Sequence, residues 1–73
     1  MPMTTPDERT RTVVRTHSFL QRLTWASTTP GVPEAIREEA RRLLRHYPGR
    51  SELSLAHAAL PRWFGELPSG EET

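Results

Sequence analysis

Three histidines offer the widest choice of chemistry in this chain, because a neutral imidazole can act as a general base or bind a metal ion. His17, His46 and His57 are too widely spaced to form the H-E-x-x-H pattern that brings two imidazoles to one zinc ion. The chain has no cysteine, and its four glycines are scattered, which excludes thiolate chemistry and a phosphate-cradling glycine loop. We therefore expect no enzyme activity, no catalytic residue, no metal and no cofactor.

A row of arginines offers a different chemistry, the binding of acidic groups. Arg11, Arg15 and Arg22 lie within about 40° of each other on a helix with 100° per residue, away from the predicted core. Val14 and Trp25 run beside this row, and tryptophan and arginine are enriched at the energetic centres of protein interfaces. The pattern indicates a surface for a partner or a second copy. The alternative is that Val14 and Trp25 belong to a broad core face.

The segment EEARRLLRHYPG, residues 38–49, places basic side chains in the last turns of a predicted helix. Cations there complement the negative end of the helix dipole. Pairing within the helix accounts for several of these arginines: Glu34 with Arg37, Glu38 with Arg41, and Glu38 with Arg42. We interpret most of this segment as a charged solvent face. Arg41, Arg45 and Tyr47 are predicted to form a second partner contact.

Composition limits the classes of protein that this chain can belong to. It has 73 residues, enough for one domain, and all of its basic side chains are arginine, which is typical of a bacterial genome of high GC content. Residues 1–50 carry nine arginines against five acids, whereas residues 51–73 carry one arginine against four glutamates. No apolar run approaches the roughly 18 residues of a membrane span, and the polar start lacks a signal-peptide pattern. We therefore expect a cytoplasmic protein without membrane contact.

The start of the first helix is the clearest local signal. In TTPDE, Thr5 fits the N-cap, Pro6 fits the first helical position, and Glu8 fits the place from which a carboxylate bonds back to Thr5. This helix is predicted to run from Pro6 to about Trp25.

Two further helices follow from apolar residues that recur every three or four positions. The second is predicted over about Pro33–His46, and a shorter third helix is predicted from Ser51 until Pro61 breaks it. Trp63 and Phe64 are expected to form a single helical turn that folds back over the core.

The fold class is therefore all-α, a small three-helix domain with a short C-terminal helical turn and a flexible tail. The predicted boundaries are a flexible N-terminus at residues 1–5, a helical domain at 6–65 and a disordered acidic tail at 66–73. The predicted core consists of Val13, Phe19, Leu20, Leu23, Ile36, Ala40, Leu43, Leu53, Leu60 and Phe64.

Two segments resemble a protein family. A T-x-P-x-E-R-T-R pattern at residues 4–11 and an L-L-R-H-Y-P box at residues 43–48 look like a group of short, uncharacterised proteobacterial proteins, a domain of unknown function. The resemblance covers about residues 4–48. It implies a bacterial, cytoplasmic accessory protein and assigns no catalytic or binding role to any residue.

These patterns predict a small non-enzymatic protein-interaction module, an adaptor or inhibitor of a bacterial or phage system. One alternative is a homodimeric accessory protein that buries Val14 and Trp25. Another is a weak nucleic-acid-binding protein that uses the basic face of the first helix. Sequence-specific DNA binding is disfavoured, because SELSLAHAAL, in the place of a recognition helix, has no arginine, glutamine or asparagine, and the net charge is only +1.

Overall fold

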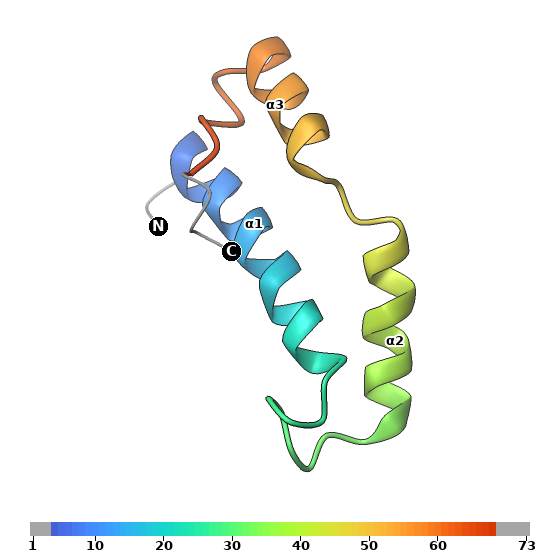
Figure 1. Cartoon of the computed structure of the whole chain (residues 1–73). Helices are drawn as coiled ribbons and strands as arrows, with labels where there is room; N and C mark the ends of the chain where they lie inside the picture. The colour runs from blue at the N-terminus through green and yellow to red at the C-terminus, as the bar shows by residue number, and fades with distance from the viewer. Residues whose placement is uncertain (1–3, 69–73) are drawn as a thin grey trace. The chain divides into compact units, whose positions relative to one another are not determined.

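The computed structural model describes residues 4–68 and contains three α-helices (Figure 1). They are α1 (Pro6–Leu23), α2 (Glu34–Arg45) and α3 (Arg50–Ala59), and no strand occurs within residues 4–68. The all-α class with three helices is confirmed. The chain divides into two compact units, and α1 contributes to both: the first unit holds residues 4–15 and 48–68 of the described chain, and the second holds residues 16–47.

The start of α1 has the predicted capping arrangement. The amide of Glu8 donates to the Thr5 hydroxyl at 3.1 Å, and the amide of Thr5 donates to the Glu8 carboxylate at 3.1 Å. Two amides that have no partner within the helix are thereby satisfied by side chains. Pro6 occupies the first helical position as expected.

The end of α1 lies at Leu23, slightly before the predicted end at Trp25. The hydroxyls of Thr28 and Thr29 donate to the carbonyl oxygen of Arg22 at 2.8 and 3.1 Å. Together with the amide of Trp25, which donates to the same oxygen at 3.2 Å, they satisfy a carbonyl group at the end of the helix. Gly31 then turns the chain with a φ of 86°, a backbone conformation that favours glycine.

The other helices begin and end close to their predicted positions. α2 begins directly after its N-cap, Pro33, and ends at its C-cap, His46. α3 begins one residue before Ser51, because Gly49 rather than Ser51 is its N-cap. The Glu52 carboxylate accepts a 2.8 Å hydrogen bond from the Gly49 amide, which fixes this start.

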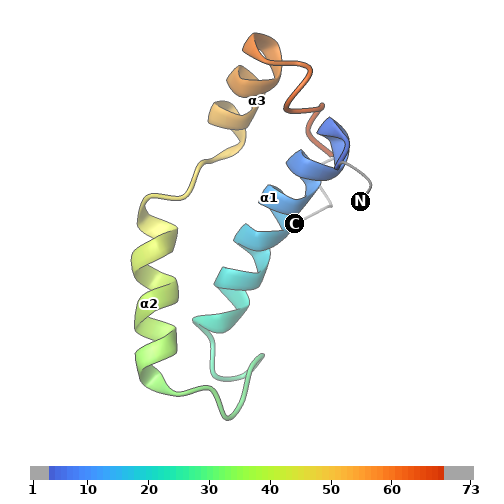
Figure 2. The same ribbon diagram turned by 180° about the vertical axis from the view of Figure 1, so that it is seen from behind.

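In the first unit, the chain after α3 returns to the first turns of α1, as the two opposite views agree (Figures 1 and 2). The amide of Gly65 donates to the carbonyl oxygen of Pro6 at 3.0 Å, and the Thr10 hydroxyl donates to the carbonyl oxygen of Gly65 at 3.2 Å. Arg9 donates to the carbonyl oxygen of Trp63, and its guanidinium lies 5.3 Å from the centre of the Trp63 ring. At the predicted helical turn, the amides of Trp63 and Phe64 both donate to the carbonyl oxygen of Leu60 at 2.9 Å, so residues 60–64 form one hydrogen-bonded turn.

The core of the first unit is small and partly polar. Val14 and Leu53 are buried, and so is Thr10, whose hydroxyl is satisfied by Gly65. A buried hydroxyl is tolerated when it forms a hydrogen bond. Thr10 therefore holds the returning chain against α1 and leaves no buried polar atom without a partner.

In the second unit, the last turns of α1 and the whole of α2 lie side by side (Figures 1 and 2). Its buried residues are Leu20, Ala40 and Arg37. Arg37 donates to the carbonyl oxygen of Leu23 at 2.8 Å and to the carbonyl oxygen of Thr29 at 2.7 Å. A buried guanidinium therefore joins α2 to the end of α1 and to the loop that follows it.

The predicted core is confirmed only in part. Leu20, Ala40 and Leu53 are buried, and Val13, Leu23 and Phe64 are half-buried, whereas Phe19, Ile36, Leu43 and Leu60 are about half exposed. The buried face of α1 is centred near His17, roughly 90° from the predicted face, because Thr10 and Val14 face inward in place of Phe19. The buried face of α2 contains Arg37, which leaves Ile36 at the edge.

The predicted boundaries of the helical domain and of the two flexible ends stay predictions. Residues 1–3 and 69–73 of those ends lie outside the described residues. Within the described part, Glu66 to Pro68 continue from the returning chain, and the carbonyl oxygen of Pro68 accepts a 2.8 Å hydrogen bond from Arg50.

Candidate functional site

An open hollow of about 590 Å³ lies in the second unit, between the end of α1 and the last turns of α2. Its lining residues are Thr24, Trp25, Arg41, Leu44 and Arg45. Three of these, Trp25, Arg41 and Arg45, were predicted to bind a partner, and the structure brings them together. The Trp25 side chain is 58% exposed, so the hollow presents an aromatic surface to solvent.

The loop after α1 positions Trp25. The amides of Thr28 and Thr29 both donate to the carbonyl oxygen of Trp25 at 3.2 Å, and their hydroxyls also donate to it. Arg37 in turn holds the carbonyl and hydroxyl oxygens of Thr29. The carbonyl oxygen of Trp25 thus accepts from two amides, and the single proton of each threonine hydroxyl is shared between this oxygen and that of Arg22. The buried guanidinium of Arg37 holds the same loop through Thr29.

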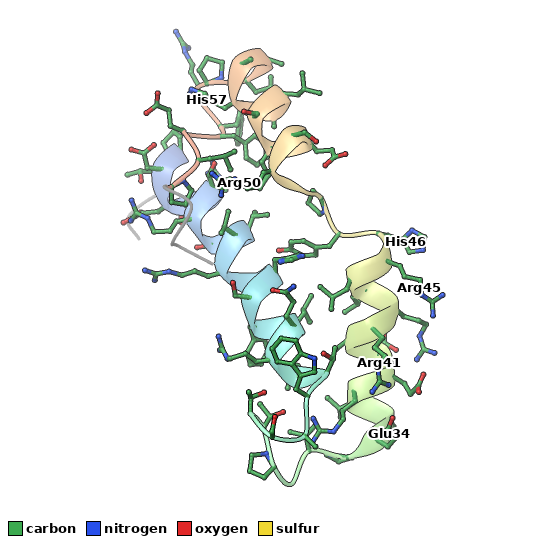
Figure 3. The ribbon with its side chains drawn as sticks, viewed as in Figure 1. Glu34, Arg41, Arg45, His46, Arg50 and His57 are labelled. Atoms are coloured by element: carbon green, nitrogen blue, oxygen red, sulfur yellow. The ribbon has the colours of Figure 1, made fainter. Side chains whose placement is uncertain are left out.

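The two arginines of the hollow have different surroundings. Arg41 pairs with Glu34 at 3.2 Å and with Glu38 at 3.1 Å, so its charge is already balanced (Figure 3). Arg45 projects from the C-terminal end of α2 (Figure 3). The ion pairs found within residues 4–68 do not include Arg45. Arg45 is consequently the cation of this hollow that is open to an acidic group.

The ion pairs along α2 differ from the predicted set. The pair of Glu38 with Arg41 is confirmed, but Glu34 bonds Arg41 instead of Arg37. Arg42 pairs with Glu39 at 2.7 Å rather than with Glu38. The hydrogen bond and the charge of Glu39 raise the pKa of the Arg42 guanidinium above its ordinary value.

The three arginines of the predicted row on α1 are exposed, but they differ in the groups that surround them. Arg11 and Arg15 lie in the first unit and form no ion pair with any residue from 4 to 68. Arg22 lies in the second unit, where its guanidinium stands 5.7 Å from the centre of the Phe19 ring. Part of its charge is therefore engaged with an aromatic face.

Two predicted binding residues do not lie on an open surface. Val14 is buried in the core of the first unit, so the prediction that it forms a surface strip with Trp25 is wrong. The reason is the rotation of the buried face of α1 toward Thr10 and Val14. Tyr47 is half-buried, and its ring centre lies 5.5 Å from that of His17.

Arg37 is the residue with a defined role that the sequence pattern did not reveal. We expected it to pair with Glu34 at the surface. A signal was present, because Arg37 stands one turn before Ala40 on the apolar side of α2, where a long aliphatic stem can be buried while its head finds an acceptor.

The histidines remain separate from one another. His57 shares a 2.9 Å hydrogen bond with the carbonyl oxygen of Phe64, which ties α3 to the returning chain. Across residues 4–68, no three His, Cys, Asp or Glu side chains gather in a way that could hold a metal ion. No helix of this part of the chain is long and apolar enough to cross a membrane.

Comparison with protein-family models, with curated proteins and with solved structures found no match to this chain. The resemblance to the group of short proteobacterial proteins therefore stays a prediction. Function has to be inferred from the surfaces themselves.

Proposed function

We propose that this chain is a non-enzymatic protein-interaction module, an adaptor or inhibitor of a bacterial system or of a phage, and that it binds through the Trp25–Arg45 hollow. The observation that carries the proposal is the joint position, in one hollow, of an exposed tryptophan and of an arginine that has no ion-pair partner among residues 4–68. Trp and Arg side chains supply much of the binding energy at many protein interfaces.

The chemistry of the hollow defines the partner. Trp25 and Leu44 offer apolar contact, while Arg45 offers a planar guanidinium that can hold a carboxylate by two parallel hydrogen bonds. The fitting ligand is a protein segment with an aromatic or aliphatic side chain close to an aspartate or glutamate. Because Trp25 stands on a fixed loop, little ordering of the main chain opposes binding.

Selection from a library of random peptides tests this proposal. The full chain should select peptides that have an aspartate or glutamate close in sequence to a large apolar residue, on either side of it. Arg45→Glu and Trp25→Ala should each weaken the selected peptide at least about tenfold.

The matched control is Arg11→Glu with Arg15→Glu, which reverses charge on α1 in the first unit. This variant should bind the selected peptide within about twofold of the wild type. If the control variant loses binding while the Arg45→Glu variant keeps it, the binding surface lies on α1. That result would contradict the proposal that the peptide binds in the hollow.

Nucleic-acid binding is a second candidate, favoured by one observation. Arg11 and Arg15 are exposed without an acidic partner in residues 4–68, and unpaired arginines suit phosphate groups. If this candidate is right, affinity for single-stranded RNA and for duplex DNA falls steeply with salt and is lost in the Arg11/Arg15 double variant. An absence of binding even at low salt would dismiss it.

A further inference from the structure

Four charged side chains form a line along one face of α2. Glu34, Glu38, Arg41 and Arg45 are all exposed and lie within about 60° of each other at 100° per residue. The two acids precede the two arginines, and Glu34, Arg41 and Arg45 can be followed in this order along the helix (Figure 3). The basic end of this charged line borders the Trp25–Arg45 hollow, and its acidic end lies beyond the hollow.

The acidic end of the charged line carries more charge than its pairing balances. The carboxylates of Glu34 and Glu38 lie 3.2 and 3.1 Å from the same nitrogen of Arg41, Nη1. Two carboxylates thus share one guanidinium, which leaves one negative charge in excess. The Glu34 and Glu38 side chains are 67% and 56% exposed, so a cation of a partner can reach them.

The basic end of the charged line has the opposite excess. Arg45 is absent from the ion pairs found within residues 4–68, and it lies in the hollow beside Trp25 and Leu44. The described part of α2 therefore presents a negative charge and a positive charge on the two sides of Arg41. An apolar surface lies next to the positive charge.

We propose that the hollow selects a partner segment that carries an acid, a large apolar residue and a base in this order. The acid pairs with Arg45, and the apolar side chain packs on Trp25 and Leu44. The base lies against Glu34 and Glu38, which become the residues that determine specificity. This inference rests on the proposed function and adds the base to it. Complementary charges favour the matching partner and disfavour a partner with another charge order.

The length of the charged line sets the spacing in the partner. Arg45 follows Glu38 by seven positions and Glu34 by eleven, which corresponds to about 10 to 17 Å at 1.5 Å per residue. An extended segment covers this distance in about three to five residues. The acid and the base of the partner are therefore expected about three to five positions apart, whereas adjacent charges cannot reach both ends of the line.

Three capped peptides test this order, with the indole N–H signal of Trp25 followed by NMR. The first is Gly-Glu-Phe-Ser-Ser-Lys-Gly. The second has glutamine in place of the lysine, and the third, Gly-Lys-Glu-Phe-Ser-Ser-Gly, keeps the composition but places the lysine beside the glutamate. The wild-type chain should bind the first peptide about threefold more tightly than either of the others at about 20 mM salt, because exposed ion pairs contribute modestly. At about 1 M salt this preference should nearly vanish.

Glu34→Gln combined with Glu38→Gln tests the residues assigned to specificity. The double variant should bind the lysine peptide and the glutamine peptide equally, because no carboxylate then meets the lysine. It should also bind the glutamine peptide at least as tightly as the wild type does, since Arg41 is released from its two carboxylates.

Glu39→Gln is the matched control. Glu39 pairs with Arg42 and lies about 140° around α2 from Glu34. This variant removes one carboxylate from the same helix and should keep the threefold preference for the lysine peptide. Circular dichroism checks that both variants keep the helix content of the wild type.

The outcomes separate this inference from the proposed function. Equal affinity of the wild type for all three peptides, with a shift of the Trp25 signal, would overturn the inference and leave the proposed function in place. A lysine preference that persists in the Glu34/Glu38 variant, or that is lost in the Glu39 control, would overturn the inference as well. If none of the peptides shifts the Trp25 signal up to about 5 mM, the proposed function fails and the inference fails with it.

Discussion

The guanidinium of Arg37 donates a 2.8 Å hydrogen bond to the carbonyl oxygen of Leu23, the last residue of α1. A charged side chain of one helix thus occupies the negative end of another helix, where the carbonyl groups lack helical amides. The same guanidinium holds both oxygens of Thr29 and so anchors the loop that carries Trp25. Arg37 therefore links the stability of the second unit to the position of the candidate binding residue.

Replacing Arg37 by methionine should lower the free energy of unfolding by about 2–4 kcal/mol. The substitution keeps the length of the buried stem but leaves the carbonyl oxygens of Leu23 and Thr29 without a donor. Urea unfolding followed by circular dichroism measures the loss. Arg42→Met is the control, because Arg42 is exposed and its surface ion pair with Glu39 is screened by solvent and contributes little to stability. Equal losses in the two variants would contradict the capping role of Arg37.

Thr10→Val should lower the free energy of unfolding by about 1–2 kcal/mol. The change keeps the volume of a buried side chain but removes the hydroxyl that donates to Gly65, and it leaves that carbonyl oxygen with one bond fewer. Thermal or urea unfolding gives the difference. Ser54→Ala deletes a hydroxyl from the exposed face of α3 and should change stability by less than about 0.5 kcal/mol.

Gly65→Ala should destabilise the first unit by about 1–3 kcal/mol. A Cβ atom at position 65 would lie 2.8 Å from the Cα atom of Asp7, so the main chain would have to move apart. Gly49→Ala is a milder change, because its Cβ atom would meet only the end of the Glu52 side chain, at 3.0 Å. A Gly65→Ala variant as stable as the wild type would show that the returning chain does not pack on α1 as described.

The helices of this chain were largely predictable, because their signals are local. Thr5, Pro6 and Glu8 form a cap within one turn, and the structure confirms it. The faces of the helices were not predictable to the same extent. Periodicity alone allows Phe19 and Ile36 to face the core as readily as Thr10 and Arg37. Which of these side chains is buried depends on hydrogen bonds to distant residues. Thr10 bonds to Gly65, and Arg37 bonds to Leu23.

The candidate site shows the same limit. Trp25 and Arg45 were predicted from residue type and from their positions on the predicted helices, and the hollow that joins them could not be derived from the helix pattern. The burial of Val14 follows from the same rotation of α1 that exposes Phe19. Local sequence thus named the candidate binding residues, whereas tertiary packing decided which of them lie in one hollow.

The two arginines of the hollow should contribute unequally to binding of an acidic peptide. Arg45→Gln should weaken the selected peptide about fivefold to twentyfold, because Arg45 has no acidic partner in residues 4–68. Arg41→Gln should change affinity about twofold or less, since Glu34 and Glu38 already balance its charge. Isothermal titration calorimetry at one salt concentration measures the affinity of each variant for the selected peptide. A larger loss for Arg41 than for Arg45 would reverse the assigned roles.

The most direct measurement follows the two tryptophan indole N–H signals by NMR while the selected peptide is added to the full chain. Trp25 and Trp63 are both 58% exposed, so each serves as the control for the other. Binding at the hollow should shift the Trp25 signal in proportion to occupancy and leave that of Trp63, which lies beside Arg9 in the first unit, unchanged. A shift of the Trp63 signal alone, or no shift of the Trp25 signal at saturation, would contradict the assignment of the hollow as the binding surface.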